Sequence, residues 1–293
     1  MKIASWNVNS IKARKDHVLK YLQDTDLDVL MVQELKGTDF PAEDFKAIGY
    51  ETAAVTQKAY NGVAVFSKTP IGLILDHLPG DPSDEQARYI EFETNGIRLI
   101  NIYLPNGNPV FSDSSSRPKA RSAEVEGSDQ TAGIEDPSTT PKGSARDDNF
   151  HEKFSYKLAW MDRLYQRFKT LRDGNTPFVI GGDFNVIPTD SDCHDPKAWK
   201  DDALAQPQTR AAFQKLTNTG LYDTFRIFNK TPNQYTFWDY QAGAWQKDNG
   251  IRIDHFLASP EITDRLISCT IDRTPRGWDK PSDHTPIIIN IAA

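Results

Sequence analysis

The stretch that decides the fold is Val179-Ile-Gly-Gly-Asp-Phe-Asn-Val-Ile-Pro188. An apolar run stops at two glycines and is followed by an acid and an amide two positions apart, Asp183 and Asn185. Short apolar runs bounded by turn residues are typical of buried β-strands. In open α/β sheets, ligand sites lie at strand ends, where loops converge. The stretch therefore predicts a strand that delivers polar side chains to the mouth of a core.

Similar patterns along the rest of the chain predict a layered α/β fold. Short apolar runs bounded by Gly, Pro or Asn predict further strands, at residues 2–9, 27–34, 61–67, 87–94, 97–104, 235–240, 251–258 and 286–291. Apolar residues at helical spacing predict helices at residues 13–23, 154–172 and 208–216. Strands with interspersed helices are typical of layered α/β architecture.

Residues 111–150 differ in composition from the rest of the chain. They are rich in Ser, Pro, Gly, Thr and charge, and Val125 and Ile134 are nearly their only large apolar residues. Such a segment cannot bury enough surface to offset the entropy of ordering it. The patterns on both sides are incomplete alone, so we predict a mobile insertion within a single domain of residues 1–293. Its eight acidic and five basic residues account for −3 of the formal charge of −7.

Composition narrows the class of protein. Hydrophobic residues make up 38% of the 293, which is enough for a sizeable core. The two cysteines, Cys193 and Cys269, lack the CxxC spacing of a zinc or redox site and fit a reducing compartment. The N-terminus has no signal-like apolar run, and no segment approaches the ~20 apolar residues that cross a bilayer. We therefore expect a cytoplasmic protein without membrane contact. The net charge alone argues mildly against nucleic acid, but an enzyme that collects carboxylates around a metal can be acidic and still carry a basic face.

Polar side chains follow several of the predicted strands. They are mostly acceptors: Asn7, Asn9, Glu34, Tyr103, Asn106, Asp254, Asp283 and His284. Each also has a structural interpretation. The asparagines can cap turns, Glu34 can form a salt bridge, and Asp183 with Asn185 can form an Asx-turn. Asp254 can pair with a base such as Arg252, His284 can be a structural histidine, and Tyr103 can belong to the core.

Taken together, these residues indicate metal-assisted hydrolysis of a phosphoester. Carboxylate oxygens suit Mg²⁺ or Mn²⁺, whereas the scarcity of histidine and cysteine disfavours zinc. An aspartate at a strand end can activate a water, an asparagine amide can donate to an oxygen that gains charge, and a histidine beside a carboxylate can face a phosphate. Metal ion, activated water and fixed donors are the components of metal-assisted attack of water.

Nine motifs in order resemble those of exonuclease III-type apurinic/apyrimidinic (AP) endonucleases, of the endonuclease/exonuclease/phosphatase superfamily. They are SWNVNSIKAR, DVLMVQELK, NGVAVFSK, NIYLPNGN, GGDFNVIPTD, LYDTFR, YTFWDY, RIDHFLAS and KPSDHTP, and they cover the chain outside residues 111–150. Other branches of the superfamily generally lack YTFWDY followed by RIDHFLAS. The resemblance implies a deoxyribonuclease I-like fold, an α/β sandwich of four layers in which two mostly antiparallel or mixed β-sheets are flanked by helices.

The resemblance also implies roles for individual residues. Glu34 would be the main metal ligand, with Asn7 and Asn9 close by and Asp283 at a second metal position or beside the histidine. Asp183 would activate water, Asn185 would steady the developing charge, and Asp254 would orient His284 at the phosphate.

The remaining roles concern the substrate. Tyr103 would hydrogen-bond near the scissile phosphate, with Asn106 beside it. Phe237, Ile251 and Ile253 would form the wall of a pocket for an extruded sugar, which suits an abasic nucleotide because no base must be unpaired. Four basic residues are candidates for phosphate contacts, namely Lys36, Lys68, Arg226 and Lys280.

We therefore predict a monomeric, Mg²⁺-dependent DNA-repair phosphodiesterase, with Mn²⁺ as a possible substitute. It would cut duplex DNA 5′ to abasic sites and trim 3′ ends. One alternative is a superfamily relative that acts on RNA tails, phospholipids or small phosphoesters. Another is a catalytically silent binding protein, which would have no need of the complete set from Asn7 to His284.

Overall fold

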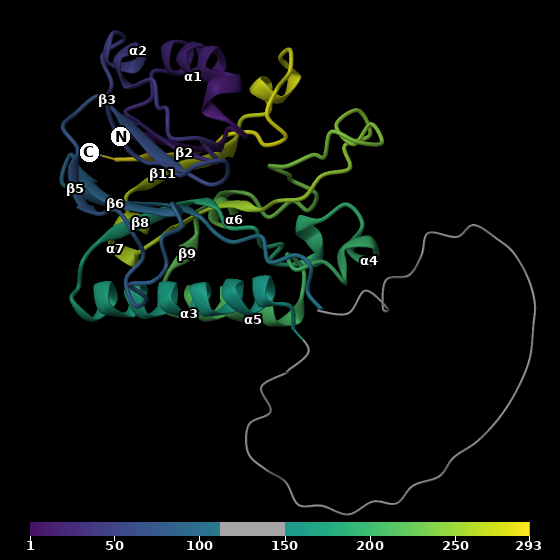
Figure 1. The fold of residues 1–293 in the computed structure, drawn as a ribbon. Coiled ribbons are helices and arrows are strands. Elements are labelled where there is room, and N and C mark those ends of the chain that lie inside the picture. Colours follow the sequence, from purple (N-terminus) through teal and green to yellow (C-terminus); the bar gives the residue numbers. More distant parts are fainter. Residues whose placement is uncertain (112–149, 293) are drawn as a thin grey trace, which may run out of the picture.

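A computed structural model describes residues 1–111 and 150–292 (Figure 1). The predicted insertion therefore lies outside the described residues, apart from its two edges. These edges, Phe111 and Phe150, form an isolated antiparallel bridge, and their ring centroids are 5.8 Å apart.

The first of two sheets has six strands and is mixed. Its order is β11 (Leu266–Ile271), β12 (Ile287–Ile291), β1 (Lys2–Asn7), β2 (Val29–Gln33), β4 (Val63–Ser67) and β3 (Glu51–Val55). Only β1 and β2 pair in parallel, and the other pairs are antiparallel.

The second sheet also has six strands and repeats this arrangement. Its order is β5 (Gly72–Leu75), β6 (Tyr89–Thr94), β7 (Ile97–Tyr103), β8 (Phe178–Asp183), β10 (Asp254–Ala258) and β9 (Tyr222–Asp223). Here β7 and β8 form the one parallel pair. In each sheet, the parallel pair therefore lies at the centre.

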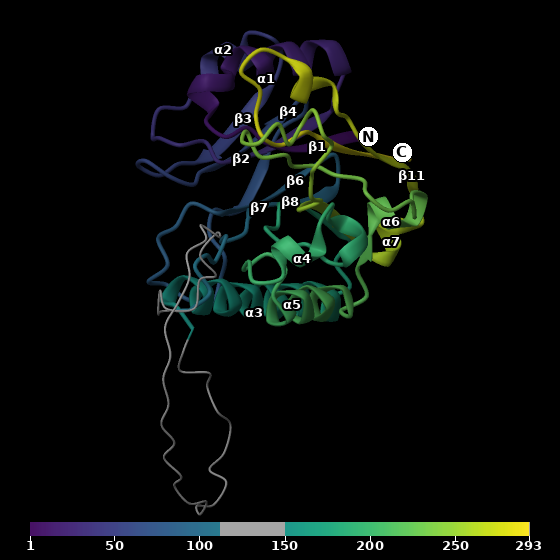
Figure 2. The ribbon, with the colours of Figure 1, turned by 90° about the vertical axis from the view of Figure 1, so that its right-hand side faces the viewer.

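Helices cover the outer face of each sheet (Figures 1 and 2). The first sheet carries α1 (Ile11–Thr25) and α2 (Ala42–Lys46), and the second carries α3 (Glu152–Asp173) and α5 (Pro207–Thr217). Shorter elements lie in the connections: α4 (Pro196–Trp199), α6 (Thr224–Phe228), α7 (Pro260–Thr263) and the 3₁₀ turns η2 (Asp190–Asp192) and η3 (Thr274–Gly277). The predicted four-layer sandwich is thus confirmed. None of the described helices has the length and apolar character of a membrane span.

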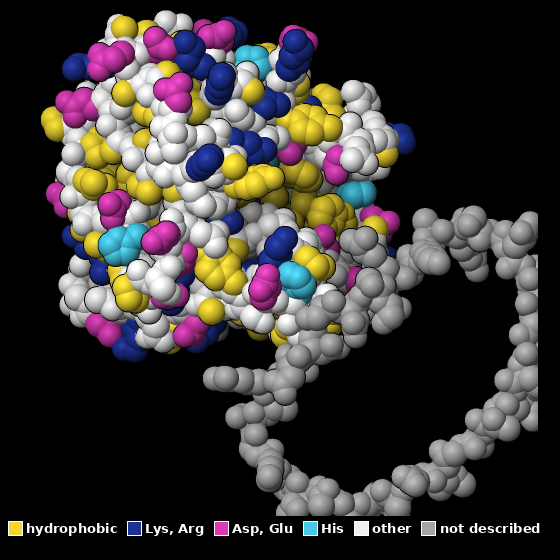
Figure 3. All heavy atoms as spheres, in the orientation of Figure 1, with side chains coloured by type: hydrophobic (Ala, Val, Ile, Leu, Met, Phe, Trp, Pro, Cys, Tyr) yellow, Lys and Arg dark blue, Asp and Glu magenta, His cyan; other side chains and the backbone are white. Residues whose placement is uncertain are grey.

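The core lies between the sheets because successive strand residues alternate between the two faces. Ile3, Met31, Leu99 and Phe256 belong to the cluster between the sheets, whereas Trp6 packs beneath α1. Figure 3 shows hydrophobic side chains in a band between the two halves of the molecule, with charged side chains spread over the helical layers. Gly181 is required where the sheets meet, because a Cβ there would lie 2.6 Å from the Met31 side chain and 2.3 Å from that of Phe256.

The predicted strand at residues 235–240 is wrong. This segment is a loop that holds to its neighbours by single bridges, from Phe237 to Ile251 and to His284. Its aromatic residues Tyr235 and Trp238 pack with Ala244 in a small separate cluster, so their apolar character does not reflect a sheet. The strand predicted from residue 251 begins only at Asp254. Four strands that the pattern did not predict are β3, β5, β9 and β11, all at sheet edges and mostly exposed or half-buried.

Candidate active site

Four strand ends bring polar side chains to one edge of the space between the sheets. Asn7 ends β1, Tyr103 ends β7, Asp183 ends β8, and Asp254 begins β10. Asp183 is the register partner of both Tyr103 and Asp254, so these three residues lie side by side across the second sheet. The strand ends therefore meet as the sequence predicted, from both sheets.

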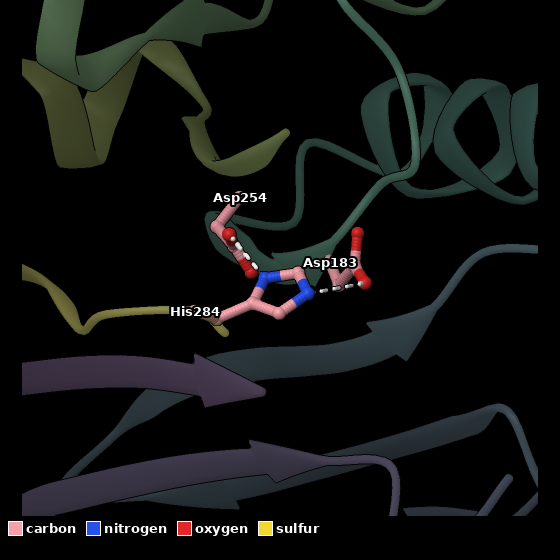
Figure 4. Close-up of side chains that lie close together, drawn as sticks. All are labelled: Asp183, Asp254 and His284. Carbon is pink, nitrogen blue, oxygen red and sulfur yellow. Dashed lines mark hydrogen bonds and ion pairs between the residues drawn. The ribbon is translucent and has the colours of Figure 1, made fainter. Parts of the chain in front are cut away.

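At the centre of this group, His284 lies between two aspartates (Figure 4). Its Nδ1 is 2.8 Å from Asp254 Oδ2, and its Nε2 is 3.7 Å from Asp183 Oδ2. Asp183 also accepts hydrogen bonds from Asn7 Nδ2 at 3.0 Å and from the Asn185 backbone N–H at 2.9 Å. The second bond is an Asx-turn, so the structural interpretation of Asp183 holds together with its place in the site.

Burial and neighbouring charges shift the pKa values of the residues in this group. The pKa of Asp183 is raised because burial and the charge of Asp254 together outweigh the effect of His284. Burial alone would lower the pKa of His284, but Asp254 and Asp183 outweigh it and raise that pKa. Burial also raises the pKa of Tyr103, helped by Glu34 and Asp183, so its phenol stays protonated as a hydrogen-bond donor.

A cleft of about 250 Å³ opens beside these residues. Ten of the twelve predicted site residues line it, namely Glu34, Tyr103, Asn106, Asp183, Asn185, Phe237, Ile251, Ile253, Asp283 and His284. The other two, Asn7 and Asp254, lie behind the lining and contact Asp183 and His284. The structure thus brings the whole predicted set together, while the role of each residue stays a prediction.

Two groups of acids can hold a metal ion. One ligand atom from each of Asp183, Asp254 and His284 lies within 4.8 Å of the others. Both ring nitrogens of His284 face carboxylates, however, and an imidazole that holds both protons has no free lone pair for a metal. Glu34 and Asp283 line the cleft together, and their oxygens suit a hard divalent cation. The donor atoms of Glu34 and Asp283 therefore suit a hard divalent cation better than those of the first group.

The surroundings of these two acids are polar. Lys36 Nζ is 2.9 Å from Glu34 Oε1 and also contacts Asn9 Oδ1. Asn9 donates from Nδ2 to Asp283 Oδ1 at 2.9 Å, so Asn9 is bonded to Asp283 directly and to Glu34 by way of Lys36. Among the four basic candidates, Lys68 pairs with Asp26 and Arg226 with Asp192, which leaves their ammonium and guanidinium groups engaged elsewhere.

The amides of Asn106 and Asn185 are fixed by hydrogen bonds. Asn185 has a left-handed φ of 48°, donates from Nδ2 to Leu104 O at 2.9 Å and accepts from Asn106 Nδ2 at 3.2 Å. A left-handed conformation is unusual outside glycine but common for asparagine in turns. The two loops that follow β7 and β8 are therefore coupled through these side chains.

The opposite side of the cleft is apolar. The Phe237 ring lies edge-on to the His284 imidazole, with centroids 5.0 Å apart, and Ile251 and Ile253 are buried beside it. Trp199 and Leu204 complete the lining, and Asp202 adds a carboxylate. These three residues are not predicted from the sequence, because α4 and the turn after it carry no strand-end pattern.

The chain is similar to known proteins over its whole length. A model of the endonuclease/exonuclease/phosphatase family matches residues 4–284. Exodeoxyribonuclease III of Haemophilus influenzae is 29% identical over 98% of this chain and 98% of its own length. Two solved structures are 32% identical over the full length of both chains. They are a 3′–5′ exonuclease (NExo) of Neisseria meningitidis, with a TM-score of 0.84, and an AP endonuclease of Archaeoglobus fulgidus, with a TM-score of 0.82.

A second structure of the Neisseria protein NExo, described as a 3′ phosphatase, contains a product DNA hairpin. It is 32% identical over the full length of both chains, with a TM-score of 0.79. The family match and these full-length relatives confirm the resemblance found in the motifs. The chain is a hydrolase of the exonuclease III/AP endonuclease family, within the endonuclease/exonuclease/phosphatase superfamily.

Proposed function

We propose that this protein is a metal-dependent DNA phosphodiesterase that cuts duplex DNA 5′ to abasic sites and trims 3′ ends. The main support is the position of Asp183, whose carboxylate contacts Asn7, the Asn185 N–H and His284. Asp183 lines a cleft that Glu34 and Asp283 also line. An acid fixed in this way beside two further carboxylates suits attack of water on a phosphate. The relatives named exodeoxyribonuclease, AP endonuclease and 3′–5′ exonuclease support DNA as the substrate.

Each polar group has a distinct task in this proposal. Asp183, whose pKa is raised, accepts the proton of the attacking water. His284 and the protonated Tyr103 donate hydrogen bonds to the phosphate oxygens. Asn185 uses one amide hydrogen on Leu104 O, which leaves the other for an oxygen that gains charge. Asp254 holds the imidazole of His284 in place through Nδ1.

The carboxylates of Glu34 and Asp283 would hold Mg²⁺, or Mn²⁺ in its place, with Asn7 near them. The bound ion would neutralise charge on the phosphate and lower the barrier to attack. Lys36 holds Glu34 in position by its 2.9 Å contact with Oε1.

The apolar wall favours a sugar that carries no base. Phe237, Ile251 and Ile253 offer packing surface but no hydrogen-bond partner for a base edge. Extruding an abasic nucleotide breaks no base pair, so its cost is small compared with that of an intact nucleotide. The wall and this low cost together select abasic sites.

The test is cleavage of a duplex oligonucleotide with one abasic-site analogue, in Mg²⁺ and in EDTA. We expect a single nick 5′ to the lesion that requires the metal, and a loss of about 10²- to 10⁴-fold in kcat for Asp183→Asn. The matched control is Asp173→Asn, at the exposed end of α3, which should cut like the wild type.

A duplex with a recessed 3′ end, assayed beside it, measures the trimming activity. Absence of any cut in either DNA by folded protein would overturn the proposal. Hydrolysis of an RNA tail or of a small phosphoester in place of DNA would instead establish the alternative superfamily function.

A further inference from the structure

Behind the cleft, α3 places a lysine in the core. Lys157 is fully buried, and its stem packs on Gly107, where a Cβ would lie 2.6 Å from Lys157 Cδ. Gly107 has a φ of 90°, so glycine is favoured there by both space and backbone conformation. A buried lysine is rare unless its ammonium group is satisfied.

The ammonium group of Lys157 joins the two loops that carry the cleft amides. Its Nζ donates to the backbone oxygen of Asn185 at 2.6 Å and to that of Asn106 at 3.0 Å. Among the residues that the structure describes, these two carbonyls are its hydrogen-bond partners, and no carboxylate is within ion-pair distance. Lys157 therefore connects the two loops through hydrogen bonds and forms no salt bridge with a described residue.

These carbonyls depend on Lys157 in turn. The Asn185 carbonyl oxygen is bonded in the buried interior, and leaving it without a partner costs free energy, so removal of the ammonium group would favour movement of the loop after β8 and release its link to the loop after β7. The side chains of the same two residues are bonded to each other, from Asn106 Nδ2 to Asn185 Oδ1, at the lining of the cleft. A displacement of a few tenths of an ångström in either loop therefore reaches both amides.

We propose that Lys157 is a positioning residue, which holds the loops after β7 and β8 so that the amides of Asn106 and Asn185 face the same phosphate. This inference rests on the proposed function, because it assigns those amides to a phosphate. Lys157 touches the substrate through neither its ammonium group nor its stem, since both lie behind the loop backbones.

The charge of Lys157 agrees with such a position. Burial lowers its pKa to about 7, although Asp202 and Asp183 oppose this shift. A cation whose charged form is poorly stabilised by the protein gains from an anion bound nearby. A phosphate in the cleft would be that anion.

A double-mutant cycle on the abasic duplex tests the proposal. Lys157→Met keeps the stem and removes the donor, and we expect kcat to fall at least about tenfold with KM little changed, because the interaction matters in the transition state. In an Asn185→Ala background, we expect the same substitution to lower kcat by less than about threefold, because one of the two amides that it positions is gone, together with its bond to the other. Lys153→Met, an exposed lysine one turn earlier on α3, is the matched control and should leave kcat unchanged.

The outcomes separate this proposal from the proposed function. If the wild type cuts no DNA, both fall. If the wild type cuts and Lys157→Met retains its kcat, only the positioning role is overturned. The same holds if Lys157→Met lowers kcat by the same factor in the wild type and in Asn185→Ala, because the two residues then act independently. Thermal denaturation shows whether Lys157→Met is folded. If it is not, Lys157→Gln, whose amide can still donate to one carbonyl, takes its place under the same criteria.

Discussion

Two buried clusters, each with two aspartates and a histidine, lie on either side of β10. The cleft cluster consists of Asp183, Asp254 and His284. The arginine cluster consists of Asp192, Asp223, Arg252 and His255. Asp254 and His255 are neighbours in the chain, but they point to opposite faces of the strand, so the same residue types enter two different environments.

The clusters differ in how completely their charges are paired. In the arginine cluster, Arg252 donates to Asp192 at 2.7 Å and to Asp223 at 2.8 Å, and its third nitrogen lies 3.0 Å from His255 Nδ1. In the cleft cluster, Asp254 Oδ1 has no hydrogen-bond partner among the described residues, and no arginine takes part. A cluster of buried charges thus does not by itself indicate an active site. A buried charged group with an unused hydrogen-bonding atom beside a cleft does.

The largest effect should come from breaking the cleft cluster at Asp254. Asp254→Asn keeps the shape but weakens the hold on His284, and we expect kcat on abasic DNA to fall by about 10²- to 10⁴-fold. Because Asp254 is also the buried ion-pair partner of His284, the free energy of unfolding should fall as well, so stability has to be measured beside activity. Steady-state kinetics and urea denaturation on the same preparation measure both.

In the arginine cluster, a substitution should lower stability but have much less effect on activity. Arg252→Met leaves Asp223 and part of Asp192 unpaired in the core, and we expect a loss of about 3–5 kcal/mol in unfolding free energy. The matched control is Arg273→Met, which breaks an exposed pair with Asp248 and should cost no more than about 1 kcal/mol. Below its melting temperature, Arg252→Met should retain more activity than Asp254→Asn. If Arg252→Met and Asp254→Asn lose the same activity, the two clusters act as one functional unit, and the division between a catalytic and a structural cluster is wrong.

The strand-end pattern was enough to predict the cleft cluster but not the arginine cluster. Regular alternation would place Arg252 and Asp254 on the same face, which is why their pairing was an open alternative. The strand begins only at Asp254, and the irregular backbone before it carries Arg252 to the side of His255. Contacts of this kind depend on loop geometry, which local residue patterns do not encode.

Lys157 shows a second limit. The spacing of apolar residues predicts its helix, but Leu158 and Tyr165 are only half-buried, whereas Lys157, Trp160 and Leu164 are buried. The position of Lys157, three residues after Phe154 and four before Met161, was a usable signal that it lies on the buried face. That its ammonium group reaches two carbonyls could not be predicted, because both belong to loops that are remote in sequence.

The smallest effect, and the most direct comparison of the clusters, is the opposite titration of their histidines. Burial and Arg252 lower the pKa of His255 from 6.5 to about 4, whereas the carboxylates raise that of His284. Between pH 6.5 and about 4, His255 binds a proton in the unfolded chain but not in the folded protein. His255 therefore makes the free energy of unfolding fall as pH falls through this range. His284 stabilises the fold below its unfolded pKa and loses this contribution as pH rises through its higher folded value.

Each histidine should therefore control one side of the stability curve, measured by urea denaturation in EDTA. His255→Gln should flatten the acid side between pH 6.5 and 4, by up to about 1.4 kcal/mol per pH unit, and leave the alkaline side unchanged. His284→Gln should flatten only the side above pH 6.5. NMR of the imidazole protons, assigned with the same variants, measures the pKa of each histidine independently. If both histidines titrate near 6.5, the difference in pairing has no electrostatic consequence, and the contrast between the clusters reduces to their position relative to the cleft.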